Sequence, residues 1–291
     1  MAAGGCAGSV VTVSELRWTF RPKVNQPVIV AAFEGWNDAG EAASHAVSYL
    51  AERWQAEEFL TIDPEPFYDF TVARPHVRIV DGDIRAIDWP SNSFAVARPE
   101  GAPDVVLLSG IEPQMRWRTF CSLVLDVARE LDARLVLSLG ALLADVPHSR
   151  PTPVFGTAYD QTVIGALKLE PSRYEGPTGI VGVLHSECHQ AQLHSASLWA
   201  TVPSYVAAAP SPKAAHALVE RVCELLGTEL RSEDLWEAGE EYERQISELV
   251  AEDPETEAYV QHLEETHDSD ESAVESLDEL VAEVERYLRD K

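Results

Sequence analysis

Short, continuous runs of apolar residues alternate with longer segments in which apolar residues recur every three or four positions. The runs are Val28 to Phe33, Asp104 to Gly110, Arg134 to Gly140 and Gly179 to Leu184. Such runs are typical of strands that helices cover on both faces, and we expect the first to be a central parallel strand. Strands that alternate with helices predict a mostly parallel sheet.

Three segments carry the helical period. The first follows Phe33, with Asp38 as its predicted N-cap and Glu41 at the third position, a variant of the capping box. The second runs from about Trp117 to Leu131, and the third ends at Gly227. Between them, residues 63–99 are rich in Pro, Asp and aromatic side chains, which predicts an irregular excursion with short edge strands such as His76 to Val80.

Beyond residue 227 the chain changes character. From Thr228 to the end it holds 23 acidic and 5 basic residues, a charge of −18 within a total of −27. Helical spacing of apolar residues predicts two amphipathic helices, the second capped by Asp253 and Pro254; the first carries Leu235, Tyr242, Ile246 and Leu249. A third amphipathic stretch, residues 274–288, either packs on a partner copy or is a solvated tail that is helical part of the time.

These patterns divide the chain into four predicted segments. They are a disordered N-terminus (1–14), an α/β domain (15–227), a helical C-terminal appendage (228–267) and an acidic linker with an amphipathic tail helix (268–291). The N-terminus has no basic region followed by an apolar stretch, and the apolar runs are shorter than a membrane span, so we expect a cytoplasmic protein. The acidic charge argues against nucleic acid and anionic membranes as partners.

Several strings resemble bacterial members of the proteasome assembly chaperone 2 family. They stand in order along residues 15–265: FEGWNDAGEAAS (33–44), LLSGIEPQMRWRTF (107–120), LGALLADVPHSRPTPVFGTA (139–158), YEGPTGIVGVLHSEC (174–188) and LWATVPSYVAAAPSPKAA (198–215). The resemblance implies a three-layer α/β/α domain of the phosphorylase/hydrolase-like type with a mixed sheet and a small helical C-terminal region. It also implies a homo-oligomer, most simply a closed trimer, and a role in proteasome assembly.

The eukaryotic relative docks on the proteasome through a C-terminal tail that contains a tyrosine. In this chain Tyr287 lies near the corresponding place, within an end that also suits a plain amphipathic helix. Both interpretations of the tail stay open.

Polar residues follow three of the predicted strands, where loops of a parallel sheet converge. The candidates for a binding site are Glu34, Trp36, Asn37, Asp38, Glu112, Arg116, Trp117, His148 and Arg150. Carboxylates, arginines and a histidine can form an acid/base site. The same residues also suit helix caps and loop hydrogen bonds, which is the structural alternative.

Other motifs are incomplete. Ser109 lacks the G-x-S-x-G setting of a nucleophile, and Gly176 to Gly179 lacks the Lys and Ser/Thr of a phosphate loop. The cluster at His185, Glu187, Cys188 and His189, with His194 nearby, is not H-E-x-x-H, so we expect no metal and no cofactor. The four cysteines are far apart and predict reduced thiols rather than a disulfide framework.

Two functional hypotheses follow. The first is a non-catalytic, homo-oligomeric interaction or assembly factor. The second is a small-molecule enzyme, a hydrolase or a carboxylate-amine ligase, that uses the loops around Asp38, Glu112 and His148. A deep polar pocket between those loops would favour the enzyme.

Overall fold

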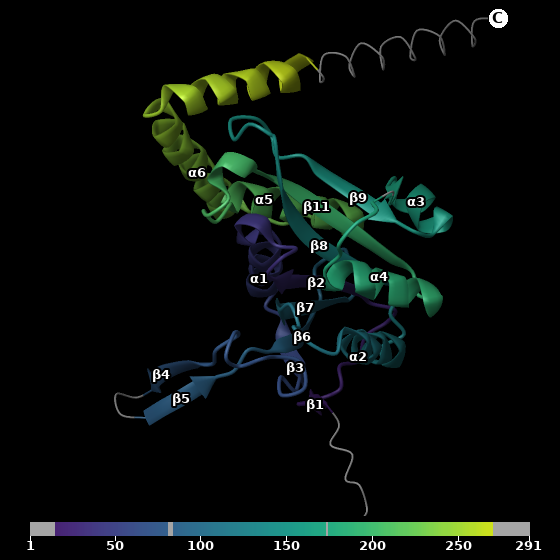
Figure 1. Cartoon of the computed structure of the whole chain (residues 1–291). Helices are drawn as coiled ribbons and strands as arrows, with labels where there is room; N and C mark the ends of the chain where they lie inside the picture. The colour runs from purple at the N-terminus through teal and green to yellow at the C-terminus, as the bar shows by residue number, and fades with distance from the viewer. Residues whose placement is uncertain (1–14, 81–83, 173, 270–291) are drawn as a thin grey trace, which may run out of the picture.

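The computed structural model describes residues 15–80, 84–172 and 174–269, in which helices cover both faces of one large sheet (Figure 1). The strand order is β1-β3-β6-β7-β2-β8-β11-β9-β10. The strands are β1 (Leu16–Trp18), β2 (Val28–Glu34), β3 (Glu57–Ile62), β6 (Asn92–Ala97), β7 (Val105–Ile111), β8 (Leu135–Ala144), β9 (Val154–Ala158), β10 (Glu170–Pro171) and β11 (Ser195–Pro203). The predicted N-terminal segment and the tail helix at 274–288 lie outside the described residues.

Strand β2 lies in the middle of four parallel strands, between β7 and β8, with β11 on the far side of β8. Its residues from Val28 to Phe33 are all buried. The even-numbered residues join one hydrophobic core and the odd-numbered residues the other, as the alternation of side chains along a strand requires. The predicted central parallel strand is therefore confirmed, and antiparallel neighbours at β6 and β9 make the sheet mixed.

Two layers of helices enclose the sheet. Helices α1 (Ala42–Arg53) and α5 (Pro212–Leu226) share one core, joined by α3 (Gln161–Leu167) beside β9. Helices α2 (Trp117–Glu130) and α4 (Ile180–Gln190) share the core on the opposite face. The expected three-layer α/β/α architecture is confirmed.

The prediction of a strand at Gly179 to Leu184 is wrong, because α4 begins at Ile180. A short apolar run does not distinguish a buried strand from the buried face of a helix. Here Ile180, Leu184 and Cys188 recur every four residues and pack into the core. The strand in this part of the chain is β11, which the sequence pattern did not reveal because Ser195, Ser197 and Thr201 interrupt its apolar residues while being buried themselves.

The excursion between residues 63 and 99 forms short strands, but not all of them border the large sheet. Strand β6 pairs with β3 and β7 inside it. Strand β4 (His76–Val80) instead pairs with β5 (Ile84–Asp88) in a separate two-stranded sheet that projects from the body (Figure 1).

The C-terminal region folds back onto the body. Helix α6 (Glu233–Ala251) is followed by a helical segment at 254–269, and their apolar residues pack against Tyr205 and its neighbours. Asp253 begins this segment, since its side chain accepts a hydrogen bond from the Glu255 amide at 3.3 Å. Leu249, which we expected on the buried face of α6, is exposed, and Val250 is buried in its place. None of the helices in the described ranges could span a membrane.

A buried histidine links the sheet to α4. His185 Nε2 lies 2.7 Å from Ser138 Oγ of β8, and both residues are buried. Burial lowers the pKa of His185 to about 4. The folded chain therefore holds this imidazole neutral.

We expect this burial to make the fold sensitive to acid. The unfolded chain takes up a proton on His185 near its ordinary pKa of 6.5, whereas the folded chain does so only near 4. The stability that neutral His185 contributes is complete above the unfolded pKa and is lost as the pH falls toward the folded pKa, by ~2 kcal/mol between about pH 7 and about pH 4.5. Urea unfolding of the wild type and His185→Gln across this range measures it. A difference between the two proteins that does not change with pH would contradict the prediction.

Candidate functional site

Four of the candidate residues meet at the carboxyl ends of β2 and β7. The Glu112 amide donates to the carbonyl of Glu34 at 2.9 Å, and Asn37 Nδ2 donates to Glu112 Oε1 at 3.1 Å. Asn37 is buried, and its carbonyl accepts from the Ala141 amide of β8 at 2.8 Å. The turns that follow two parallel strands therefore lie side by side, as the topology predicts.

The carboxylate of Glu112 also holds the start of α4. Its Oε1 accepts a hydrogen bond from the Ile180 amide at 2.8 Å, which satisfies a donor at the N-terminus of the helix. Gly179 leaves room for this contact: a Cβ there would lie 2.7 Å from Glu112 Oε1 and 2.2 Å from Asn37 Nδ2. Glu112 thus joins β7, the turn after β2 and helix α4.

Asp38 caps α1, although not in the predicted manner. A 3₁₀ turn at Ala39–Glu41 precedes the helix, and Asp38 Oδ1 reaches across it to accept from the amides of Ala43 at 2.7 Å and Ser44 at 3.2 Å. Glu41 is itself the N-cap residue, in the left-handed region, so the capping box is not formed. Burial raises the pKa of Asp38 despite these hydrogen bonds.

The glycine of this turn has a separate role. Gly40 has a φ of 59° and its carbonyl accepts from the Ser211 amide at 2.7 Å, just before α5. A Cβ at Gly40 would lie 3.0 Å from that of Ser211. Both the positive φ and the close approach of the two segments favour glycine.

Glu34 is the candidate with the most exposed carboxylate of this group. Partial burial raises its pKa, and the nearby charges of Asp38 and Glu41 add to the effect. Trp36 beside it is 63% exposed. A carboxyl group with a raised pKa can exchange protons near neutral pH more readily than an ordinary one.

Arg116 and Trp117 do not converge on Glu34. The guanidinium of Arg116 lies over the ring of Phe67, 5.8 Å from its centre. The indole of Trp117 donates to the carbonyl of Pro113. Both side chains stabilise the turn between β7 and α2.

His148 and Arg150 form a second cluster, against the C-terminal helices. Tyr205 Oη accepts from the His148 amide and lies 2.8 Å from His148 Nδ1, while His148 Nε2 lies 3.0 Å from Ser247 Oγ of α6. Lys213 Nζ donates to the His148 carbonyl at 2.6 Å and pairs with Glu243. This network ties the loop after β8 to α5 and α6.

The protonation of His148 follows from these partners. Ser247 Oγ donates to the Glu243 carbonyl at 2.9 Å, so it is free to accept from Nε2, and the Tyr205 hydroxyl can donate to Nδ1. Neutral imidazole satisfies every group. Burial, together with the charge of Lys213, lowers the pKa of His148 against the opposing charges of Glu243 and Glu264.

Arg150 extends the same contact to residues 254–269. Its Nε lies 2.8 Å from Asp268 Oδ1 and its Nη2 lies 2.9 Å from Asp268 Oδ2. Ser149 donates to Glu264. The loop that we predicted to form part of a ligand site therefore contacts the C-terminal segment.

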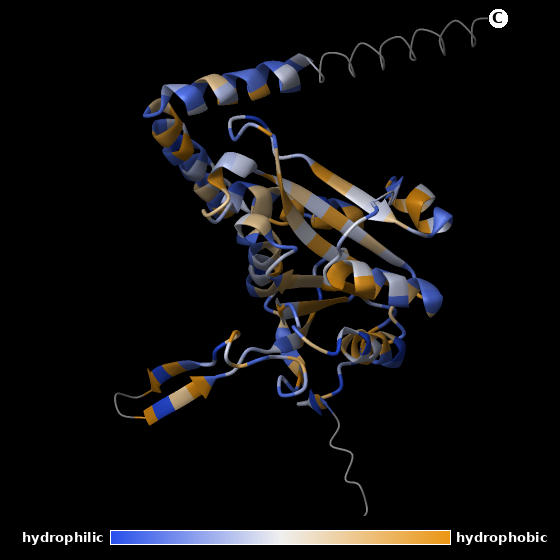
Figure 2. Cartoon of the chain, in the orientation of Figure 1, coloured by the Kyte–Doolittle hydropathy of each residue, from blue (hydrophilic) through white to orange (hydrophobic). Residues whose placement is uncertain are grey.

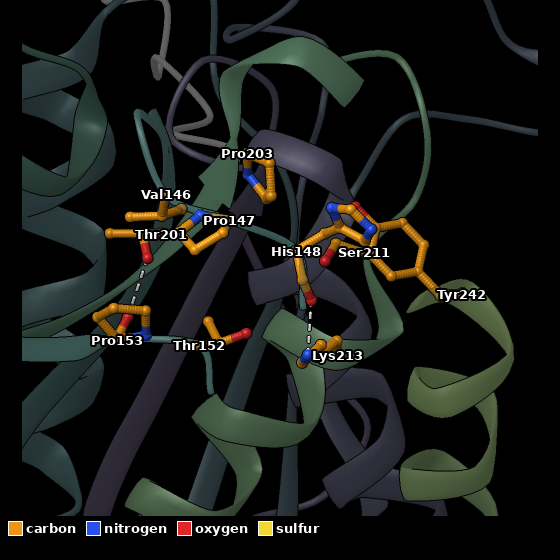
Figure 3. A pocket seen from close by; sticks show the side chains of 10 residues that line it. All are labelled: Val146, Pro147, His148, Thr152, Pro153, Thr201, Pro203, Ser211, Lys213 and Tyr242. Atoms are coloured by element: carbon orange, nitrogen blue, oxygen red, sulfur yellow. Dashed lines mark hydrogen bonds between the residues drawn. The ribbon is translucent and has the colours of Figure 1, made fainter. Parts of the chain in front are cut away.

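Two pockets in the described structure lie away from Glu34 and Glu112. One cavity of about 10 Å³ adjoins His148, beneath Pro203, Ser211 and Tyr242 (Figure 3). It has room for about one water molecule. A second pocket of about 260 Å³ lies between β3 and Trp89, and its lining contains none of the candidate residues.

Several residues of the second cluster were not among the candidates. Tyr205, Ser211 and Lys213 contact or surround His148, yet they follow it by more than 50 positions. Their spacing gives no local signal, and Lys213 fits equally well as an ordinary residue in the first turn of α5. Only the folded chain brings them together.

The histidine and cysteine cluster has structural contacts instead of a common centre. His185 faces Ser138 inside the fold, the ring of His189 lies 5.7 Å from that of Tyr159, and His194 Nδ1 lies 2.8 Å from Asp160 Oδ2. In the part of the chain that the structure describes, no group of three or more His, Cys, Asp or Glu is placed to hold a metal ion.

Comparison with known proteins identifies the family to which the chain belongs. The family model described as the PAC2 family matches residues 32–250, which include both clusters. The chain belongs to the PAC2 family. No curated protein sequence matches it.

Two solved bacterial structures are similar in both sequence and fold. A PAC2 family protein from Streptomyces avermitilis is 46% identical, with a TM-score of 0.76 over 80% of this chain and 99% of that one. A proteasome-assembly chaperone homologue from Mycobacterium tuberculosis is 50% identical, with a TM-score of 0.73 over the same shares. An archaeal proteasome activator from Pyrococcus furiosus, 17% identical with a TM-score of 0.65 over 80% of this chain and 97% of that one, shares the fold.

We expect Glu112 to be a stability determinant. Glu112→Ala leaves the buried Asn37 amide and the Ile180 amide without their acceptor, which costs about 2 kcal/mol of unfolding free energy. Glu112→Gln keeps an acceptor and costs less. Urea unfolding at neutral pH measures both, with Glu237→Ala on the exposed side of α6 as the control. Equal stability of the Glu112→Ala variant and the control would show that the junction does not depend on this carboxylate.

Proposed function

We propose that this PAC2 family protein is a cytoplasmic, non-catalytic assembly factor that works as a homo-oligomer, most simply a trimer, on proteasome subunits or related client proteins. The relative from Mycobacterium tuberculosis, a proteasome-assembly chaperone homologue, supports this proposal because half of its residues are identical over almost its whole length. Closed rings also leave no unsatisfied copy of the interface.

The proposal that the protein is non-catalytic rests on the hydrogen bonds that the polar side chains at the strand ends make within the fold. Glu112 accepts from Asn37 and from α4, and Asp38 accepts from α1. His148 and Arg150 bind the C-terminal helices. A catalytic group must be able to reach its substrate, and these side chains instead connect elements of the fold.

One observation favours the alternative, a small-molecule hydrolase or carboxylate-amine ligase. Glu34 is exposed beside Trp36, and its pKa is raised. A carboxyl group with a raised pKa next to an exposed aromatic ring is an arrangement that substrate sites use. Neither Glu34 nor Trp36 lines the two pockets described above.

The acidic net charge of the chain favours client proteins with basic surfaces. A chain of net charge −27 attracts basic protein surfaces and repels acidic ones over about 8 to 10 Å at physiological salt. We therefore expect binding to clients to weaken as salt is raised.

The proposal is tested by binding to purified proteasome subunits. We expect the full-length chain to co-elute with recombinant mycobacterial proteasome α-subunits and not with β-subunits, which serve as the matched control. Light scattering on the free chain gives its mass and thus tests the trimer separately. If the chain co-elutes with neither subunit, at low as well as physiological salt, the proteasome-related role is contradicted. A monomeric mass would contradict the oligomer.

A further inference from the structure

The β4–β5 hairpin is the part of the fold with the least support from the rest of the molecule. Its two strands pair with each other and with no other strand in the described ranges. Its base is attached through Trp89, whose ring lies 4.8 Å from that of Phe70. We refer to residues 74–89 as the arm; its strands β4 and β5 project from the body in Figure 1.

One face of the arm is apolar. The register pairs Val77 with Ile87 and Ile79 with Arg85, so these four side chains lie on the same face. Val77 is 60% exposed, Ile79 59% and Ile87 52%. Figure 2 shows hydrophobic residues along both strands.

The opposite face holds the hairpin together. Arg78 Nε lies 3.0 Å from Asp88 Oδ1 and 2.7 Å from Asp88 Oδ2, across the two strands. Both residues belong to the face away from Val77 and Ile87. The ion pair therefore leaves the apolar face uncovered.

Such an arrangement is unfavourable for an isolated chain. A two-stranded hairpin is marginally stable in water unless a third strand or another element covers it. Its open strand edges and contiguous apolar side chains also invite association. The arm thus has the properties of an interface.

We propose that the occupant of the apolar face is a second copy of this chain, and that the arm forms a contact between copies. The inference rests on the homo-oligomer of the proposed function and names its contact surface. Charge decides between occupants. The arm contains three Arg and three Asp, a formal charge of zero, in a chain of −27.

Two copies of so acidic a chain repel each other over most of their surface. Among its paired residues, the apolar face of the arm carries one charged side chain, Arg85, and no acidic one, so two copies approach there at little electrostatic cost. A phosphate-bearing partner would need an excess of Lys and Arg, which the arm as a whole lacks. A basic partner would be attracted to the acidic surfaces rather than to the arm. A second copy is the occupant that fits both the charge and the apolar character.

The test is the mass of the full-length chain in light scattering. The variant Val77→Thr/Ile79→Thr/Ile87→Thr keeps β-branched residues suited to strands and removes the apolar surface. We expect the wild type to be oligomeric and the variant to dissociate at least tenfold more readily. Leu249→Thr, which alters an exposed leucine of α6, is the matched control and should keep the wild-type mass.

Photo-crosslinking gives a second measurement that does not depend on the triple variant. A photoreactive residue at position 79 should yield covalent dimers of the chain, and one at position 249 should not. An oligomeric wild type with a triple variant of unchanged mass would overturn the arm contact while leaving the oligomer intact. Dissociation of the control together with the triple variant would also overturn it, and a monomeric wild type would remove both the oligomer and the arm contact.

Discussion

The arrangement of the segments at the carboxyl ends of β2 and β7 depends on the hydrogen bonds that the Glu112 carboxylate accepts. This carboxylate accepts hydrogen bonds from the side chain of Asn37 and from the amide of Ile180, so one oxygen joins the turn after β2, the end of β7 and the start of α4. All three segments come from distant parts of the chain. Because Asn37 also binds β8 through its backbone carbonyl, partly buried hydrogen bonds join these segments at the edge of the parallel sheet, and breaking them is costly.

This closure explains why a polar edge need not be an active site. The carboxyl ends of parallel strands collect unpaired amides from the helices that follow them, and acidic side chains are the natural acceptors for those amides. Asp38 serves α1 and Glu112 serves α4. Once those two carboxylates are engaged, Glu34 and Glu41 are the exposed acids of the segment that follows β2.

The sequence predicted the parts of the fold that local patterns determine. The run at β2 is apolar at every position because helices cover both its faces, and Gly227 ends α5 through a left-handed cap. It failed at α4, where an apolar run of strand length belongs to a helix whose start is stabilised by Glu112, 68 residues earlier. The sequence also did not show that the candidate residues form two clusters, because the contact of His148 with Ser247 joins residues 99 positions apart.

The fold accommodates the polar groups of the two clusters but not the apolar face of the arm. Polar groups that the chain cannot leave to water are satisfied within the fold, and Arg150 and His148 draw the acidic C-terminal helices onto the body in the process. The apolar face of the arm has no such internal solution, because its strands pair only with each other in the described structure. In a chain so acidic, an apolar surface whose paired residues include a single charged side chain, Arg85, is where we propose that copies associate at little electrostatic cost. The hairpin, which is marginally stable in an isolated molecule, would be covered in that contact.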